Sequence, residues 1–492
     1  MSNAHHSLSS ADTAWLHMDR PTNLMVINSI LLFDEQLDWE RLEQVICTRL
    51  VEPYPRFRER VAESRLAVGG AHWETDPNFE LARHLHRLGL PAPADQSSLQ
   101  ELAGDLASIP LDRGKPLWEM YFVDGPGQGC AVIVRMHHCI ADGIALAQVL
   151  LSLTDAAAEG EPRSEPAHEP ERRRSTLRAI AQAPLDTLSD TAATAIAPIT
   201  GTIGATRRLS ATLVREGAHT LAHPRHAPEL ADALLAEVRA TRKLLFTPRD
   251  SRSALKRELG TQRSVAWSRP LSLARVKAIA HAQGATVNDV LLAAVSGALR
   301  GYLIEQGETP HEIRTLVPVN LRPLERLAPD ALGNLFGLVF LTLPVDRSSR
   351  RQRLSELNRR MNAIKHSAEG PVSYAMLEAA GLTPPEVERW IIDFFTAKAT
   401  AVMTNVPGPR ETVYLAGSPL RTVLVWAPTA GSVGMSVSIF SYDGRITVGL
   451  LVHAATVPDP RAIVRRLHRE IAAMARLAPD ERAERSPNRQ SA

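Results

Sequence analysis

Residues 131–143 of the chain read Ala-Val-Ile-Val-Arg-Met-His-His-Cys-Ile-Ala-Asp-Gly, and this stretch decides the fold. Residues 131–136 are apolar except for one arginine, which predicts a buried strand. A second strand is predicted over Trp118–Val123, and the turn residues Asp124-Gly125-Pro126-Gly127 between the two predict a hairpin. Apolar residues recur at helical spacing after Asp142, so a helix is predicted to begin at Asp142 or Gly143. A strand, a histidine pair and a helix start thus follow one another directly.

The histidine pair carries the chemistry that this stretch offers. Because side chains alternate along a strand, His137 and His138 point to opposite faces, and at most one of them faces a given pocket. A histidine with a pKa near its usual value of roughly 6.5 can take a proton from an alcohol that attacks a carbonyl. Asp142 at the helix start can accept backbone N–H bonds or pair with a cation. Gly143 permits close packing or an unusual backbone angle.

Three other interpretations of this stretch compete with a general base. A zinc site could use His137, His138 and Cys139, but consecutive residues on a strand do not converge, and no second cluster has ligand spacing. Cys139 could be a nucleophile, although its apolar neighbourhood favours a structural thiol. A purely structural pair also stays open for the motif in isolation, because seven-residue patterns recur by chance.

The bulk composition bounds the class of protein. The chain has 492 residues, 44% of them hydrophobic, and single cores stop growing at roughly 250–300 residues, so two or more domains are expected. Lys+Arg 56 against Asp+Glu 54 gives a net charge of only +2, which argues against nucleic-acid binding. Three cysteines without framework spacing indicate a reducing compartment. No secretory signal and no uninterrupted apolar stretch of roughly 18–20 residues is visible. We therefore expect a cytoplasmic protein, with contact to a membrane surface left open.

The chain divides into four segments. Residues 1–155 are predicted to form an α/β domain, and residues 251–479 a second one. Residues 156–250 are predicted to be a linker, disordered where Glu, Pro and Arg dominate and helical afterwards. The helical part, Thr176–Phe246, has two interpretations: a bridge between the domains, or an amphipathic surface that lies on lipid. Residues 480–492 are predicted to be a disordered tail.

Several further motifs accompany the histidine pair. Residues 137–143 match the HHxxxDG signature of coenzyme A-dependent acyltransferases. From Leu8 to about Leu477 the chain resembles the bacterial wax ester synthase/acyl-CoA:diacylglycerol acyltransferase family, with residues 155–246 matching least. The other matching stretches, in order, are residues 8–12, 55–58, Pro116-Leu117-Trp118-Glu119, 286–290, 318–322, Gly333-Asn334, 404–409 and 441–444. The stretch 253–260 departs from the family pattern, because Lys256-Arg257-Glu258 replaces its Asn-Gly.

The resemblance implies a fold and a reaction. Two chloramphenicol acetyltransferase-like domains would lie side by side, joined by the helical linker, with the active-site channel at their interface. The enzyme would move a long-chain fatty acyl group from acyl-CoA, its co-substrate, to diacylglycerol or a long-chain fatty alcohol. No permanently bound cofactor and no metal is implied. Peripheral contact with the inner membrane or lipid inclusions is a further expectation. The rivals are a condensation-type enzyme that acts on another acceptor and a catalytically inactive lipid-binding member of the fold.

The resemblance also implies roles for single residues. His138 would be the general base, His137 a supporting residue, and Asp142 would hold the loop, with Arg20 or Arg322 as its arginine partner. Asn288 and Asp289 would shape the site or the domain interface. Leu117 and Trp118 are expected in the core more than at the substrate. Asn405 and Gly408 would line the tunnel or form a tight turn.

Overall fold

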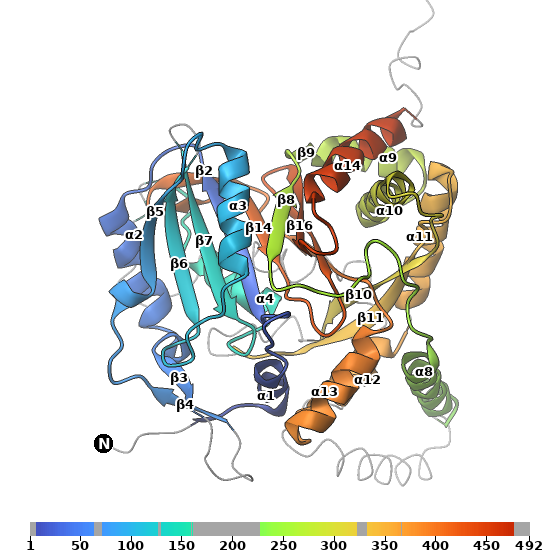
Figure 1. Cartoon of the computed structure of the whole chain (residues 1–492), viewed down its shortest axis with the longest axis horizontal. Helices are drawn as coiled ribbons and strands as arrows, with labels where there is room; N and C mark the ends of the chain where they lie inside the picture. Colours follow the sequence, from blue (N-terminus) through green and yellow to red (C-terminus); the bar gives the residue numbers. More distant parts are fainter. Residues whose placement is uncertain are drawn as a thin grey trace, which may run out of the picture.

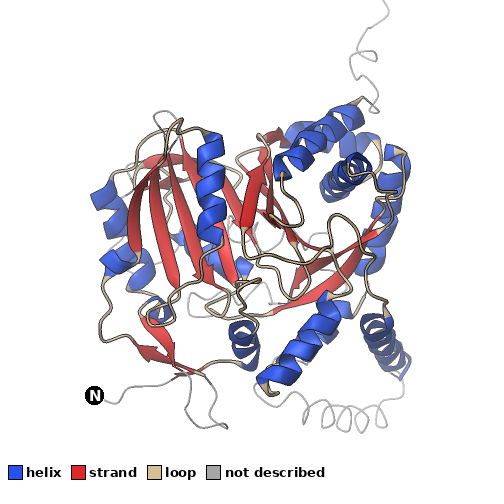
Figure 2. Cartoon of the chain, viewed as in Figure 1, coloured by secondary structure: helices blue, strands red, loops and turns tan. Residues whose placement is uncertain are grey.

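The computed structural model describes residues 6–62, 71–125, 129–158, 160, 227–321, 332–365 and 367–476. Two α/β halves lie side by side, each built on its own sheet, and helices cover the sheets (Figure 1, Figure 2). The predicted two-domain α/β class is confirmed. The predicted disordered linker, the predicted tail 480–492 and Arg322 lie outside the described residues.

The first half is a six-stranded sheet centred on the predicted hairpin. Its order is β13-β14-β2-β7-β6-β5, antiparallel except for the parallel pair β5–β6. Its strands are β2 Val26–Phe33, β5 Leu85–Gly89, β6 Trp118–Asp124, β7 Cys130–His137, β13 Tyr414–Leu415 and β14 Ser418–Trp426. Its helices are α1 Ser10–His17, α2 Trp39–Ile46, α3 Gln96–Ala107 and α4 Gly143–Ser152, with the short η1 Cys47–Val51, η2 Pro55–Phe57 and η3 Leu81–Arg83. A small sheet of β1 His6–Ser7, β4 His72–Thr75 and β3 Glu59–Ala62 lies beside it.

The alternation of β7 explains how the first sheet is covered. Val132 and Val134 belong to the larger core of the first half. Ala131 and Ile133 point to the other face, where they pack with α3 and with Val265 of the second half. A Cβ on Gly104 of α3 would lie 2.9 Å from the Arg263 carbonyl oxygen, so the halves approach closely there. Both faces of β7 are therefore buried, which explains why its sequence is an almost continuous apolar run.

The second half is a seven-stranded mixed sheet. Its main path is β11-β10-β12-β15-β16-β8, β9 pairs with β16, and β12 runs parallel to both of its neighbours. The strands are β8 Arg263–Trp267, β9 Leu271–Ser272, β10 Ile313–Asn320, β11 Phe336–Leu343, β12 Ala401–Pro407, β15 Met435–Tyr442 and β16 Arg445–His453. Helices α9 Leu273–Ala282, α10 Val287–Glu305, α11 Arg350–Lys365 and α14 Pro460–Ala475 pack over one face, and α8 Ala227–Phe246, α12 Glu369–Ala380 and α13 Pro385–Thr396 lie together below it (Figure 1).

Helix α10 is a core element of the second half. Among the described residues it is the one helix that is long and apolar enough to cross a membrane by length and composition. However, 72% of its apolar window is buried inside the protein. Thr286 caps its start and exchanges hydrogen bonds with Asp289 in a capping box. The helix therefore packs against protein rather than lipid.

Strand β14 crosses from the second half into the first. By sequence it lies inside the predicted C-terminal domain 251–479, yet it pairs with β2, with Ile30 opposite Leu424. Trp426 at its end packs in the cluster that joins the two halves. The predicted boundaries therefore do not describe the first sheet, which draws on residues 414–426. A β-rich run marks a strand, but which sheet the strand joins depends on contacts that are distant in sequence.

Candidate active site

The histidine pair lies where β7 ends. His137 is the last strand residue and pairs with Val26, and His138 opens a turn that leads into α4. The backbone N–H of His138 donates to the Met25 carbonyl at 2.7 Å. The chain thus leaves the strand between the two histidines, and their side chains diverge: His138 lines a cavity, whereas His137 is not among the residues that line it.

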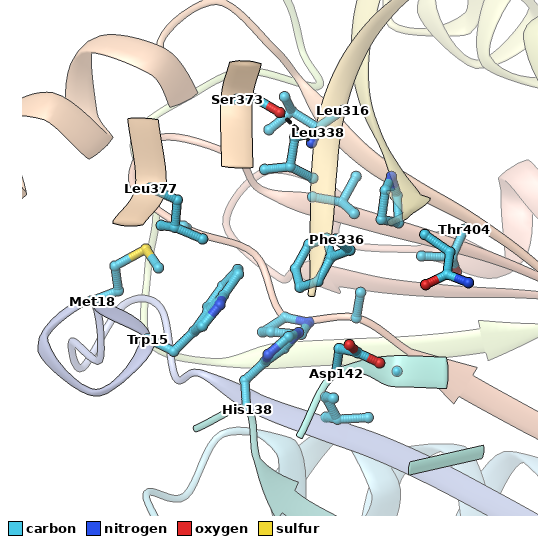
Figure 3. A pocket seen from close by; sticks show the side chains of 18 of the residues that line it. Trp15, Met18, His138, Asp142, Leu316, Phe336, Leu338, Ser373, Leu377 and Thr404 are labelled. Carbon is cyan, nitrogen blue, oxygen red and sulfur yellow. Dashed lines mark hydrogen bonds between the residues drawn. The ribbon is translucent and has the colours of Figure 1, made fainter. Parts of the chain in front are cut away.

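The cavity lies between the two halves and has a volume of about 230 Å³ (Figure 3). From the first half it is lined by His138, Asp142, Gly143 and residues of α1 and α4. From the second half it is lined by β10, β11, β12 and the helices α8, α12 and α13. Most of its walls are apolar side chains, among them Met18, Leu316, Phe336, Leu338, Leu377 and Ile392. A pocket of this kind suits an alkyl chain, because burial gains about 0.8 kcal/mol per CH₂.

The His138 ring is enclosed between aromatic side chains. Trp15 stacks on it with centroids 4.1 Å apart and an interplanar angle of 19°, and Phe336 lies at 5.6 Å (Figure 3). The Nδ1 atom is fully enclosed, so Nε2 is the ring nitrogen that the cavity can reach. Burial lowers the pKa of His138 to about 4, although Asp142 counteracts it. The imidazole is therefore neutral at neutral pH and able to accept a proton.

His137 and Cys139 support the turn from behind. The His137 Nδ1 accepts the backbone N–H of Cys139 at 3.1 Å. Burial, helped by Arg113 and His138, lowers the pKa of His137 to about 3. Burial also raises the pKa of the Cys139 thiol well above its usual value, so the reactive thiolate is disfavoured. Within the described residues no group of three or more His, Cys, Asp or Glu side chains is arranged to hold a metal.

Asp142 fixes the turn to α4 and to the second half. Its Oδ1 accepts the N–H groups of Ile144 and Ala145 at 3.1 and 2.9 Å, which caps α4. Its Oδ2 accepts the N–H of Leu335 at 3.1 Å, and its own N–H donates to the Gly333 carbonyl. The carboxylate also lines the cavity. It therefore holds the loop, as the resemblance implied, and does so across the domain interface.

Two polar side chains hold the turn from other directions. Asn334 Nδ2 donates to the His138 carbonyl at 2.8 Å and to Asp12 Oδ1 at 2.7 Å. Arg56 donates to the Ile140 carbonyl at 2.6 Å, and its guanidinium lies 3.8 Å from the Asp12 carboxylate. Arg20, one of the two arginines expected to pair with Asp142, instead forms an ion pair with Asp393 of α13 at 3.0 Å.

Gly143 has a different role from the one predicted. Its φ is not positive, and a Cβ placed on it would meet nothing within 4 Å. The expectation of close packing or an unusual backbone angle is therefore wrong. Since Gly143 lines the cavity beside His138, the missing side chain keeps that space open.

The remaining predicted site residues divide between the cavity and the core. Asn405 lines the cavity, and its Nδ2 donates to Asn288 Oδ1 at 2.9 Å. Asp289 does not line the cavity. It completes the α10 capping box, and its Oδ2 accepts a hydrogen bond from Asn358 Nδ2 at 2.9 Å. Gly408 lies against Phe440, where a Cβ would come within 2.5 Å of the ring. It is needed for close packing, and the adjoining Pro407 lines the cavity instead.

The Pro116–Glu119 motif belongs to the core of the first half. Leu117 and Trp118 are buried. Trp118 Nε1 donates to the Phe57 carbonyl at 2.9 Å, and its ring stacks on His84. Glu119 forms ion pairs with Arg135 and Lys115, both at 3.1 Å. Pro116 joins this strand to the preceding loop, and none of the four residues lines the cavity.

The segment that departs from the family pattern lies near the end of α13. Lys256 Nζ donates to the carbonyls of Thr396 and Ala399. Burial lowers the pKa of Lys256 to about 8. Lys256 is not a lining residue, although its partner Thr396 is.

Sequence reasoning missed several residues that shape the cavity. Trp15 and Phe336 flank His138, but neither was singled out, because stacking between distant segments leaves no periodic signal. The walls contributed by α12 and α13 were missed because no helix was predicted over residues 369–396. Asn334 was quoted in a matching motif, but its contact with the His138 carbonyl needed the folded chain.

A buried histidine that presents one nitrogen to an apolar cavity between two α/β halves, in an HHxxxDG turn, is the arrangement expected of an HHxxxDG acyltransferase. Family models agree: residues 8–291 match the wax ester synthase/diacylglycerol acyltransferase catalytic domain, and residues 332–475 match the C-terminal domain of the same family. The chain belongs to this family, and the resemblance found in its motifs is confirmed.

Known relatives and structures agree with this assignment. A probable diacylglycerol O-acyltransferase of Mycobacterium tuberculosis is 27% identical over 475 residues, 94% of this chain and 93% of the relative. The structure of a wax ester synthase/diacylglycerol acyltransferase from Marinobacter aquaeolei VT8 is 20% identical, with a TM-score of 0.65 over 96% of this chain and 99% of that one. The first condensation domain of the calcium-dependent antibiotic synthetase is 15% identical, with a TM-score of 0.55 over 98% and 97%. The last two likenesses show the fold.

Proposed function

We propose that the protein transfers a long-chain fatty acyl group from acyl-CoA to the hydroxyl of diacylglycerol, of a long-chain fatty alcohol, or of both. The observation that carries the proposal is the His138 ring, whose accessible nitrogen faces an apolar cavity built by both halves. A neutral imidazole in that place can deprotonate an alcohol while the cavity walls hold alkyl chains and exclude water.

The reaction needs one base and no protein nucleophile. His138 Nε2 takes the hydroxyl proton as the acceptor oxygen attacks the thioester carbonyl carbon. The C–O bond of the ester forms and the C–S bond breaks. The imidazolium returns its proton to the departing thiolate, so the products are the ester and free coenzyme A. Asp142, which raises the pKa of His138 against the effect of burial, stabilises the protonated ring between these steps.

The test supplies palmitoyl-CoA with either hexadecanol or dioleoylglycerol and follows free thiol and ester product. His138→Ala is expected to lose nearly all turnover and to keep its fold, as judged by circular dichroism. Ser373→Ala is the matched control, because Ser373 also lines the cavity but bonds to Leu338 N and Gly370 O. Undiminished turnover in His138→Ala would remove this mechanism. Ester formed with only one of the two alcohols would identify the acceptor.

We propose that the lipid-facing surface of the protein lies on α8 and on the α12–α13 pair. Three large apolar side chains of these segments are exposed: Phe246 at the end of α8 at 78%, Leu382 between α12 and α13 at 72%, and Trp390 of α13 at 68%. Leu244, Leu377 and Ile392 of the same three helices line the cavity. Helices that expose apolar side chains on the outside and line the cavity on the inside would let water-insoluble acceptors pass from lipid into the site. We place the enzyme in the cytoplasm, peripheral on the inner membrane or on lipid inclusions.

Vesicles of phosphatidylcholine and dioleoylglycerol test this surface with the full chain. The triple variant Phe246→Ser, Leu382→Ser, Trp390→Ser is expected to bind vesicles at least about tenfold more weakly, because each side chain contributes apolar burial. Its control is Ile109→Ser with Ile304→Ser, since both isoleucines are 51% exposed on other elements. Equal vesicle binding by the triple variant and the control would refute this surface.

A further inference from the structure

Asn334 joins three parts of the chain that are distant in sequence. It is buried, precedes β11, and uses its side-chain amide nitrogen to reach Asp12 of α1 and the carbonyl of His138. Both hydrogens of Nδ2 are thereby used. Asp12 itself is 1% exposed and can only accept in its ionised form, so the amide nitrogen must face it. Burial raises the pKa of Asp12, and Arg56 and Asn334 counteract that effect.

This orientation leaves one polar atom of each residue enclosed. Asn334 Oδ1 and His138 Nδ1 are both fully buried, and neither has a hydrogen-bond partner within the normal distance. The two residues are already joined through the contact of Nδ2 with the His138 carbonyl. Burial has the largest effect on the pKa of His138 and lowers it, whereas Asp142, the His138 carbonyl and, last, the Asn334 side chain raise it. An amide raises a histidine pKa where its oxygen faces a ring N–H.

We propose that Asn334 is a positioning residue for His138: its amide oxygen receives the Nδ1–H, so that the ring keeps its proton on Nδ1 and presents the Nε2 lone pair to the cavity. The inference rests on His138 being the general base of the proposed function. Asp12 determines which way the amide points, and Arg56 holds Asp12 and the turn together through the Ile140 carbonyl. The tautomer of the base is thus set by a series of contacts that begins at Arg56 of η2 and runs through Asp12 and Asn334.

Several titratable and charged groups surround His138 and influence its pKa. Asp142 faces it from the start of α4, and His137 precedes it on β7. Asp12 lies behind Asn334, with Arg56 beyond it. A carboxylate placed at position 334 would be the nearest new charge, and an opposite charge within roughly 4–6 Å raises a histidine pKa by about 1–3 pH units.

A swap of the two side chains tests the proposal in the full-length enzyme. The double variant Asp12→Asn, Asn334→Asp reverses donor and acceptor between positions 12 and 334 and places a carboxylate at Nδ1. The acid limb of its kcat/KM profile is expected to move up by about one pH unit or more. Asn334→Leu removes the amide, and its kcat is expected to fall about 100-fold with little change in KM. Asp95→Ala, which removes the α3 cap away from the cavity, should leave the profile where it is.

A second measurement keeps the test decisive if a variant folds poorly. Nitrogen NMR of ¹⁵N-histidine-labelled protein, with the His138 signals assigned by loss in His138→Gln, should show a protonated Nδ1 in the wild type. Mixed tautomers in the wild type, or an unshifted acid limb in the swapped variant, would overturn the role of Asn334. Those results would leave the proposed function standing as long as His138→Ala is inactive. An active His138→Ala would refute the proposed function instead.

Discussion

Removal of the Asp142 carboxylate should destabilise the fold more than removal of an ordinary helix cap. Asp142→Ala deletes two N-cap bonds on α4, and a lost cap costs about 0.5–2 kcal/mol. It also leaves the N–H of Leu335 without its acceptor, and an unpaired buried donor costs about 1–3 kcal/mol. The two contributions lie on different halves, so the free energy of unfolding is expected to fall by about 1.5–5 kcal/mol.

The matched comparison is Asp95→Ala. Asp95 caps α3 through Ser98 N at 3.0 Å and Ser98 Oγ at 3.2 Å, away from the cavity, so its loss should cost about 1 kcal/mol. Urea unfolding at neutral pH, followed by circular dichroism, gives both values. Asp142→Ala should also lower turnover, because the turn that presents His138 loses its attachment. If Asp142→Ala unfolds at the same urea concentration as Asp95→Ala, the carboxylate does not join the two halves as argued.

Three further outcomes follow from the site. Burial lowers the pKa of His138 to about 4, so its base form persists from neutral pH downwards. In a profile corrected for the folded fraction, kcat/KM should fall only as the pH drops through about 4. An acid limb near the ordinary histidine pKa of roughly 6.5 would contradict this. Gly143→Leu should fold normally but fill the open space beside His138, so kcat/KM should fall about 100-fold. Gly408→Ala should instead lower the melting temperature, because its Cβ would collide with Phe440. The opposite pattern in melting and turnover would refute both assignments. Cys139→Ala should retain turnover. In the native protein a thiol reagent should react with Cys47 before Cys139, because burial raises the pKa of the Cys139 thiol and encloses it. Rapid labelling of Cys139 in the native protein would count against its structural role.

Local signals predicted the elements that carry the motif. The β6–β7 hairpin, the helix after Asp142 and the α10 start at Thr286 were all predicted from turn residues, caps and apolar spacing. These features depend on residues within a few positions of one another. Strand alternation also anticipated that the two histidines would diverge, although His138 already lies in the turn.

Features that need distant segments were not predictable in this way. The stacking of Trp15 on His138 and the Asn334 contact bring together residues from α1, the turn and the start of β11. The Pro116–Glu119 motif was singled out as a family match, and the expectation that Leu117 and Trp118 lie in the core is confirmed. The two apolar helices α12 and α13 shape much of the cavity, and nothing in their own residues indicates which cavity they would face.

Strand β14 has a consequence for the order in which this protein folds. The first sheet cannot acquire β14 until the chain has been synthesised to Trp426, almost its whole length after β2. Until then the edge of β2 presents unpaired backbone groups next to an apolar sheet, which is a site for wrong strand pairing. A nascent chain that holds the complete HHxxxDG motif therefore lacks a complete catalytic sheet, and the site matures only when the second half has emerged and returned one strand to the first.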